Sequence, residues 1–152
     1  MKRILQRGGG WVAGQSLLLV GVVGLALWHP GTGSVVWRCA GALVLVIGAV
    51  VARAGKKALG RNLTPFPEPA DHAKLVQHGI YAKIRHPLYT SVILAGFGWA
   101  LLWLSWPSAL AAAAMIPFFH AKSRREEHLL CQRFPEYRAY ETGTRRFLPW
   151  IY

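Results

Sequence analysis

The sequence predicts an all-α integral membrane protein of about four transmembrane helices, arranged as two hairpins. Two observations lead to this fold class. Long apolar runs without charge alternate with polar segments, and the formal net charge of +12 is gathered in those polar segments. A length of 152 residues is typical of one domain, so we expect residues 1–152 to form a single unit. Because apolar runs separate the basic clusters, we expect no nucleic-acid partner.

The first hairpin is expected to consist of spans over residues 11–28 and 35–51. The first span is free of charge and has tryptophan at both ends, where this residue often anchors a helix at the membrane interface. It is too long for a typical signal-peptide core, so we expect it to be retained. Residues 29–34 have the composition of a turn. Arg38 interrupts the second run near its start, where its side chain can reach the interface.

The second hairpin is expected from apolar runs over residues 90–106 and 108–120, with Pro107 breaking the chain between them. Both runs are short compared with the roughly 20 residues that cross a bilayer. The polar stretch 53–85 precedes them and carries three alternating prolines, which favour an extended path.

Lysine and arginine lie almost entirely in the N-terminus, the central polar stretch and the C-terminal tail, whereas both predicted turns contain none. By the positive-inside rule, we expect a multi-pass protein with both termini and the central stretch in the cytoplasm. Gly14, Gly21, Gly41 and Gly48 are small positions where helices could approach closely. They could equally be the glycines that are common in membrane helices.

A first polar cluster, residues 75–89, leads directly into the third span. Gly79 allows a turn, and Pro87 suits the first turn of a helix. The proline restricts His86 to an extended conformation beside that helix's free backbone donors, where a carboxylate is favoured. Alternatively, Arg85 and His86 could be interfacial anchors, and the nearby tyrosines could belong to an aromatic belt.

A second polar cluster follows the fourth span. If that helix continues past His120, Lys122 and Glu126 lie four residues apart and share a face. Tyr137 and Tyr140 could share a later face in the same way. The alternative is a solvated, charged extension of the helix.

Together the two clusters form an ordered pattern around the second hairpin: Gly79-x-Tyr81, His86-Pro87-x-Tyr89, Glu126-Glu127-x-x-Leu130, Tyr137-x-x-Tyr140 and Arg146-Phe147-Leu148-Pro149. This pattern resembles the isoprenylcysteine carboxyl methyltransferase family, which is related to the membrane phospholipid N-methyltransferases. The resemblance covers roughly residues 75–149. It implies a membrane methyltransferase domain that uses S-adenosylmethionine.

The resemblance also implies which residues hold the cofactor, in regions of about 74–89 and 122–149, the latter including a C-terminal helix. Carried over one by one, these residues are Lys74, Leu75, Val76, Gly79, Tyr81, His86, Pro87, Leu88, Tyr89 and Glu126. The family often has an arginine four residues before the glutamate, and Lys122 stands there in this chain. Lysine keeps the charge but not the bidentate fork, so Arg124 or Arg125 could engage the substrate in its place.

The expected catalytic residues are His86, Glu126 and Lys122. A carboxylate acceptor is already nucleophilic and needs no general base, whereas an amine acceptor would need Glu126 or His86 to take its proton. The expected acceptor is a lipidic or prenylated small molecule. The resemblance favours a prenylcysteine carboxylate, and a phospholipid amine or another hydrophobic molecule is the alternative. A non-catalytic membrane scaffold is the alternative from another class. We expect contact with membrane lipids and no metal.

Overall fold

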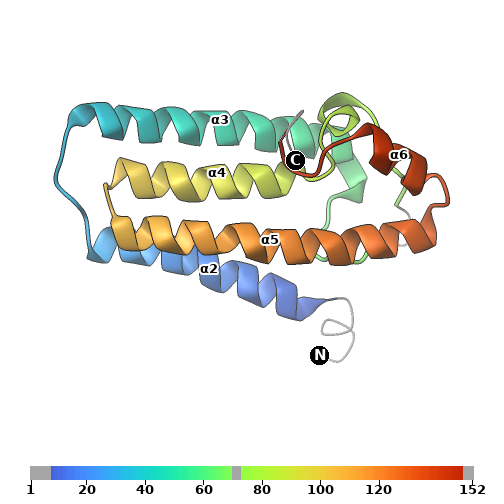
Figure 1. Ribbon diagram of the computed structural model, residues 1–152, viewed down its shortest axis with the longest axis horizontal. Coiled ribbons are helices and arrows are strands. Elements are labelled where there is room, and N and C mark those ends of the chain that lie inside the picture. Colours follow the sequence, from blue (N-terminus) through green and yellow to red (C-terminus); the bar gives the residue numbers. More distant parts are fainter. Residues whose placement is uncertain (1–7, 70–72, 149–152) are drawn as a thin grey trace.

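The computed structural model describes residues 8–69 and 73–148. All the secondary-structure elements assigned within these residues are helices, so no β-strand is present there. Four long helices form two hairpins, and both hairpin turns lie at the same end of the molecule, opposite a short C-terminal helix (Figure 1). The α-helices are α2 (Gly9–Trp28), α3 (Val35–Leu59), α4 (Pro87–Leu102), α5 (Trp106–Arg133) and α6 (Tyr137–Gly143). Two short 3-10 helices, η1 (Gly60–Asn62) and η2 (Gly79–Ala82), lie between α3 and α4.

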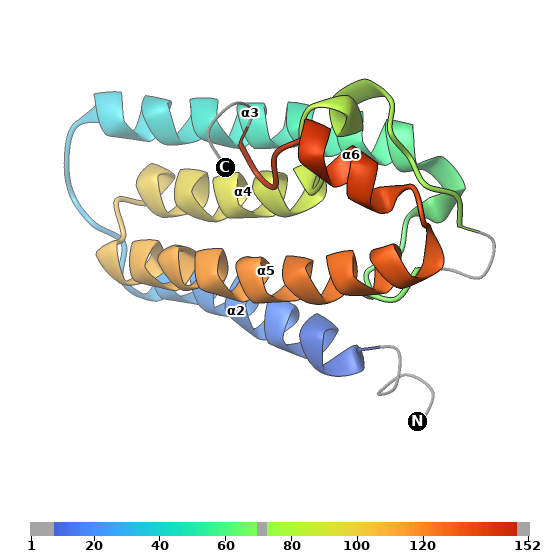
Figure 2. The ribbon, with the colours of Figure 1, turned by 45° about the vertical axis from the view of Figure 1, so that its right-hand side comes forward.

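Helix α4 occupies the middle of the bundle. It lies between α3 and α5 in both views of the ribbon, and α2 lies beside α5 (Figures 1 and 2). The most extensive helix contact joins α3 to α4. The core forms where α2, α4 and α5 meet, around Val22, Met115 and Phe119.

Glycines set the distance between α3 and α4. Gly41, Gly48 and Gly55 recur every seven residues and are buried on one face of α3. A Cβ atom at Gly41 would lie 2.4 Å from the backbone nitrogen of Leu102, so a larger residue there forces the helices apart. The predicted close approach is therefore confirmed at Gly41 and Gly48. It is wrong at Gly21, which has no neighbour within 4 Å.

Arg38 joins the two hairpin turns. Its guanidinium donates to the carbonyl of Gly31 at 3.2 Å and to the carbonyl of Leu102 at 3.1 Å. The Gly31 amide also donates to the Trp103 carbonyl at 2.9 Å. Because these carbonyls end helices or turns and lack helical partners, the contacts satisfy groups that would otherwise need water.

The boundaries of the second hairpin differ from the prediction. The expected break at Pro107 is wrong, since α4 ends at Leu102 and α5 already begins at Trp106. Proline is tolerated in the first turn of a helix, because that turn has no use for its missing N–H. The chain reverses instead at residues 103–105, where Leu104 has a positive φ of 54°. Helix α5 then continues past His120 to Arg133, as anticipated from the second cluster.

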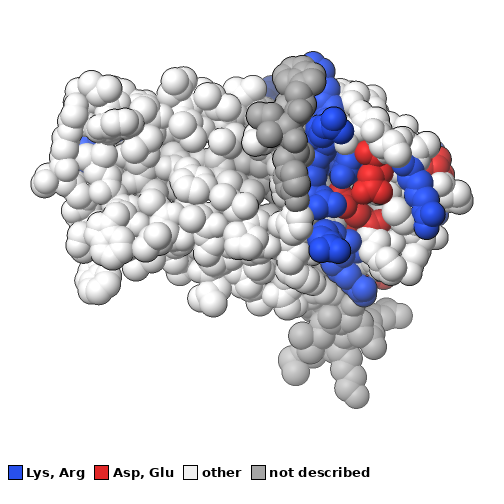
Figure 3. Space-filling view, viewed as in Figure 1, with Lys and Arg blue, Asp and Glu red and all other residues white. Residues whose placement is uncertain are grey.

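Two helices of the described chain, α2 and Val35–Asn62, are long and apolar enough to cross a membrane, and α4 is a shorter apolar helix. Large apolar side chains on α2 and α3 face outward, including Leu17, Val20 and Val46. Lysines, arginines and acidic residues gather at one end of the visible face, and the rest of that face is almost free of charge (Figure 3). This separation is that of a membrane protein whose polar groups collect at one end.

Candidate functional site

The polar end of the molecule is built by the segment between α3 and α4. After η1, Asn62 holds the returning chain: its side-chain amide donates to the Lys74 carbonyl at 3.0 Å and accepts from the Lys74 amide at 3.3 Å. Gly79 then adopts a positive φ of 63°, which glycine reaches without strain, and opens η2. Pro87 starts α4, so His86 precedes the helix at a fixed position.

This path encloses a cavity of about 110 Å³ at the end of the bundle. Its walls come from the segment 59–89, the end of α5 and helix α6. Most of the predicted cofactor-binding residues line it: Lys74, Leu75, Val76, Tyr81, His86, Leu88, Tyr89 and Glu126. Five further lining residues lie within the predicted regions 74–89 and 122–149 but were not named individually: Arg85, Leu130, Phe134, Tyr137 and Tyr140. The lining residues outside those regions are Leu59, Asn62, Thr64, Phe66, Pro67, Pro69 and Ala73.

Tyr89 and Glu126 connect the two polar clusters inside this cavity. The Tyr89 hydroxyl donates to Oε2 of Glu126 at 2.6 Å. The His86 ring stacks on Tyr89 with centroids 5.3 Å apart and planes within 2°. Nδ1 of His86 lies 3.7 Å from Oε2 of Glu126. Glu126 lines the cavity and is half-buried, so its carboxylate remains accessible from the cavity.

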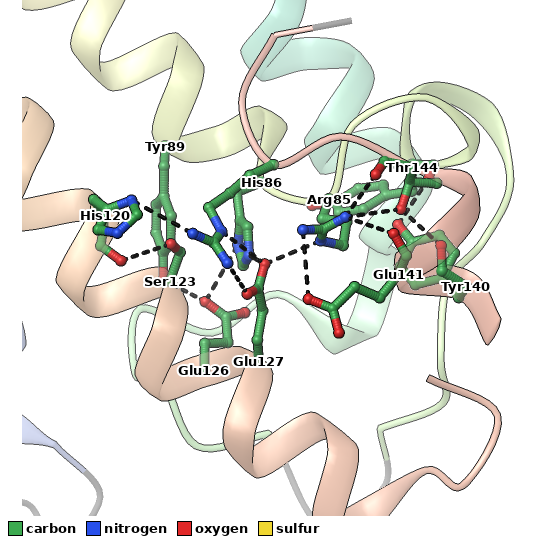
Figure 4. A network of polar contacts seen from close by, with 12 residues as sticks. Arg85, His86, Tyr89, His120, Ser123, Glu126, Glu127, Tyr140, Glu141 and Thr144 are labelled. Atoms are coloured by element: carbon green, nitrogen blue, oxygen red, sulfur yellow. Dashed lines mark hydrogen bonds and ion pairs between the residues drawn. The ribbon is translucent and has the colours of Figure 1, made fainter. Parts of the chain in front are cut away.

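Glu127, the next residue, does not line the cavity and lies beside Glu126 in a buried ion-pair cluster (Figure 4). Its Oε1 accepts from Nε of Arg85 at 3.0 Å and lies 3.0 Å from Nε2 of His86. Its Oε2 accepts from Nη2 of Arg146 at 2.6 Å. Burial by itself raises the pKa of Glu127, but the hydrogen bonds from His86, Arg146 and Arg85 outweigh it and hold the pKa far below its usual value.

The ionised Glu127 carboxylate determines which ring nitrogen of His86 must carry a hydrogen. A carboxylate only accepts hydrogen bonds, so Nε2 of His86 must carry a hydrogen to pair with it. The remaining ring nitrogen, Nδ1, is the one that faces Glu126. One buried glutamate thus orients the histidine toward the other glutamate.

The chain after α6 returns to the start of α4. The amides of Arg85 and His86 donate to the carbonyls of Arg145 and Arg146 at 2.7 and 3.0 Å, and the Arg145 amide donates to the Lys83 carbonyl at 3.1 Å. These bonds make an isolated parallel bridge between Ile84 and Arg145. The bridge positions Arg146 beside Glu127, and the chain after α6 thereby covers the start of α4.

Three predicted residues at the start of the α5 extension lie away from the cavity lining. Lys122 is buried, and its Nζ donates to Oε1 of Gln15 at 2.7 Å and to the Pro65 carbonyl at 3.1 Å. The same Nζ lies 5.1 Å from the centroid of the Tyr89 ring. Burial lowers the pKa of Lys122, while the charge of Glu126 raises it. Arg124 and Arg125 are exposed.

Two predicted cofactor residues, Gly79 and Pro87, shape the backbone rather than line the cavity. Glu127 was not assigned a role from the sequence, although it belongs to the pattern Glu126-Glu127. The available signal was its rarity, since the chain has only six acidic residues against 18 lysines and arginines. Within residues 8–69 and 73–148, no group of three or more His, Cys, Asp or Glu side chains is arranged to hold a metal ion.

A bundle of apolar helices with an aromatic-lined cavity at its charged end defines a membrane-type protein with a candidate ligand site at its helix termini. The chain belongs to the phospholipid methyltransferase family, whose model matches residues 36–136. Protein-S-isoprenylcysteine O-methyltransferase A of Arabidopsis thaliana is 27% identical over 115 residues, which are 73% of this chain and 58% of that protein. The resemblance to the isoprenylcysteine carboxyl methyltransferases is thereby confirmed.

The chain is also similar to a metal-resistance protein and to a methyltransferase of known structure. The nickel-cobalt-cadmium resistance protein NccN of Alcaligenes xylosoxydans xylosoxydans is 37% identical over 78 residues, which are 50% of this chain and 36% of that protein. The structure of the eukaryotic intramembrane Ras methyltransferase ICMT shares the fold, with a TM-score of 0.68 and 24% identity, over 75% of this chain and 42% of that one. The chain thus spans about half the length of the curated relatives it matches.

Proposed function

We propose that residues 1–152 form a single membrane methyltransferase domain, which uses S-adenosylmethionine to methylate a lipidic acceptor at the membrane surface. The observation that carries this proposal is the joining of the two polar clusters. Tyr89, at the start of α4, and Glu126, on α5, meet at 2.6 Å in one cavity. Membership of the phospholipid methyltransferase family supports the same activity.

The cavity has the chemistry to hold a positively charged ligand. When bound, S-adenosylmethionine supplies its methyl group from a sulfonium, which carries a positive charge. The Glu126 carboxylate would attract that charge, and the ring of Tyr81 would stabilise it by cation–π interaction. The Tyr89 ring is stacked on His86 and Phe119, so Tyr89 would act through its hydroxyl on Glu126. Lys74, Leu75 and Val76 would form the wall contributed by the extended segment. Gly79 and Pro87 would hold the path of that segment.

The acceptor determines whether a base is needed. For a prenylated cysteine carboxylate, the acceptor oxygen is already an anion, so the protein would contribute position and exclusion of water. For a phospholipid amine, a proton must leave first, and Glu126 is the carboxylate placed to take it, with Nδ1 of His86 3.7 Å away. We favour the carboxylate because several relatives are named as isoprenylcysteine O-methyltransferases.

For the substrate's carboxylate, Lys122, Arg124 and Arg125 remain our proposed contacts. Lys122 is tied to Gln15 and Pro65, so engaging a substrate would require it to exchange one of these partners. Substituting Lys122 by Met should therefore raise KM for a carboxylate acceptor. Arg124→Gln and Arg125→Gln would report on the exposed alternatives in the same assay. An unchanged KM in all three variants would remove this part of the proposal.

Placement in the membrane completes the proposal. We propose that the four long helices all pass through the bilayer and that both termini and the cavity lie on the cytoplasmic side. The charge-free hairpin turns and the charged cavity end support this orientation.

The direct test combines binding with turnover. Calorimetry with S-adenosylhomocysteine should detect binding to the purified protein, and binding should be lost in Glu126→Gln and His86→Ala. Glu136→Gln serves as the matched control, because Glu136 is exposed and does not line the cavity. Labelled S-adenosylmethionine offered with a prenylated cysteine, and separately with phosphatidylethanolamine, would identify the acceptor. Absence of binding in the native protein would favour the scaffold alternative.

A further inference from the structure

Tyr137 carries a buried hydroxyl whose hydrogen-bonding capacity is unused by the described protein. The residue opens α6, and only 1% of it is exposed. Its hydroxyl has no hydrogen-bond partner among the described residues. The neighbouring Tyr140, whose ring lies 5.6 Å away, instead donates to the Tyr81 carbonyl at 2.7 Å. Two similar tyrosines, three residues apart, therefore differ in whether their hydroxyls are satisfied.

Such a group calls for an explanation, because buried polar atoms in native proteins nearly always have partners. Among the side chains that the structure describes, the other two buried groups without partners are the indole nitrogens of Trp99 and Trp103, near the opposite end of α4. Neither tryptophan lines the cavity, whereas Tyr137 does. The unused donor thus belongs to a residue that lines the cavity to which we assign a ligand.

The hydroxyl is kept in its donor form. Burial raises the pKa of Tyr137 well above its usual value, the charge of Glu127 raises it further, and the charge of Arg85 lowers it. The net direction is upward, so the phenol retains its hydrogen at neutral pH. A ligand meeting Tyr137 would encounter a donor beside an aromatic wall that includes Tyr81 and Tyr140.

We propose that the Tyr137 hydroxyl donates a hydrogen bond to an acceptor atom of the methyl donor and of its demethylated product. This inference rests on the proposed function and assigns a hydrogen bond to one residue of α6, the helix that already forms part of the cavity wall. The acceptor atom belongs either to the nucleoside or to the amino-acid part of the ligand.

Tyr137→Phe tests the proposal, because it removes one oxygen and keeps the ring. Calorimetry with S-adenosylhomocysteine should show affinity about tenfold weaker than that of the native protein, which equals about 1.4 kcal/mol. The melting temperature of the ligand-free variant should be unchanged or higher, since a desolvated hydroxyl without a partner is lost. Tyr140→Phe is the control: it should lower the melting temperature, because it leaves the Tyr81 carbonyl unpaired.

The outcomes separate this inference from the proposed function. If the native protein binds the ligand and Tyr137→Phe binds it equally well, the hydroxyl does not contact the ligand and the inference fails alone. A lower melting temperature or unfolding of ligand-free Tyr137→Phe would show that the hydroxyl already has a partner, and would also overturn it. Failure of the native protein to bind would overturn both. Adenosine as a second probe assigns the acceptor: an equal loss of affinity for adenosine places it on the nucleoside.

Discussion

At the scale of single residues, Glu127 holds together parts of the chain that are far apart in sequence. It pairs with Arg85 and His86 before α4 and with Arg146 after α6. Substituting Glu127 by Gln would remove the carboxylate that two partly buried guanidinium groups share, while Arg85 keeps Glu141 at 3.6 Å. We expect a loss of about 3 kcal/mol in the free energy of unfolding, since breaking a buried pair from one side is costly.

Thermal unfolding in detergent measures this loss. Glu136→Gln is the control, because it makes the same substitution at a different glutamate. Glu136 is exposed, so its variant should unfold close to the native temperature. If both variants unfold together with the native protein, the ion-pair cluster contributes no net stability.

The same residue predicts how stability depends on pH. The pKa of Glu127 is lowered in the folded protein, and its ordinary value is 4.5. Its contribution is therefore fully present above about pH 4.5 and is lost progressively as the pH falls below that value. The melting temperature of the native protein should drop below pH 4.5 more steeply than that of Glu127→Gln. Parallel curves for the two proteins would contradict this assignment.

Adjacent glutamates also show the limit of reading a sequence residue by residue. Glu126 was assigned to the cofactor from its place in a family pattern, while Glu127 received no role. On a helix, neighbouring residues point about 100° apart, so one of the two had to leave the cavity. Nothing local in the sequence says that the partners of Glu127 come from residues 85, 86 and 146, because that pairing depends on the return of the chain after α6.

At the scale of elements, the α3–α4 contact depends on the missing side chain of Gly41. Substituting Gly41 by Ala should destabilise the protein by about 1–3 kcal/mol, because the new methyl group would meet the backbone of α4. Gly24→Ala on α2 is the matched control. Gly24 has no neighbour within 4 Å, so alanine there should be neutral or stabilising by up to about 1 kcal/mol.

Midpoints of thermal or denaturant unfolding would rank the two glycine variants. Equal midpoints would mean that α3 and α4 can separate slightly without cost.

Apolar length and charge were sufficient to predict α2 and the apolar part of α3, but not the continuation of α3 to Leu59 or the reversal between α4 and α5. The prediction relied on Pro107 as a helix breaker, and the structure uses it in the first turn of α5. The true turn passes through Leu104 at φ 54°, a conformation that leucine rarely adopts. Packing against Gly31, rather than any local sequence signal, accompanies that turn.

At the scale of the whole molecule, the proposed orientation can be tested by labelling. With Cys39 and Cys131 replaced by serine, Thr32→Cys places a thiol in the α2–α3 turn and Thr142→Cys places one on α6. Both positions are exposed. In intact cells, a membrane-impermeant maleimide should label Thr32→Cys, whereas Thr142→Cys should react only after permeabilisation. The reverse pattern would invert the proposed topology.

The site as a whole was predictable to the extent that it follows family spacing. Residues 74–76, Tyr81 and Glu126 line the cavity in the structure. The wall from Thr64 to Pro69 was missed, because a proline-rich stretch predicts an extended path but not its destination. That destination depends on distant contacts such as the one between Lys122 and the Pro65 carbonyl.

The return of residues 145 and 146 to the start of α4 has a consequence for the order of events during synthesis. All four long helices leave the ribosome before these residues do, so the helical bundle can assemble first. Glu127 and His86 must then await Arg146, which is made some 60 residues after His86. The ion-pair cluster around Glu127 can therefore be completed only after the four long helices have been made.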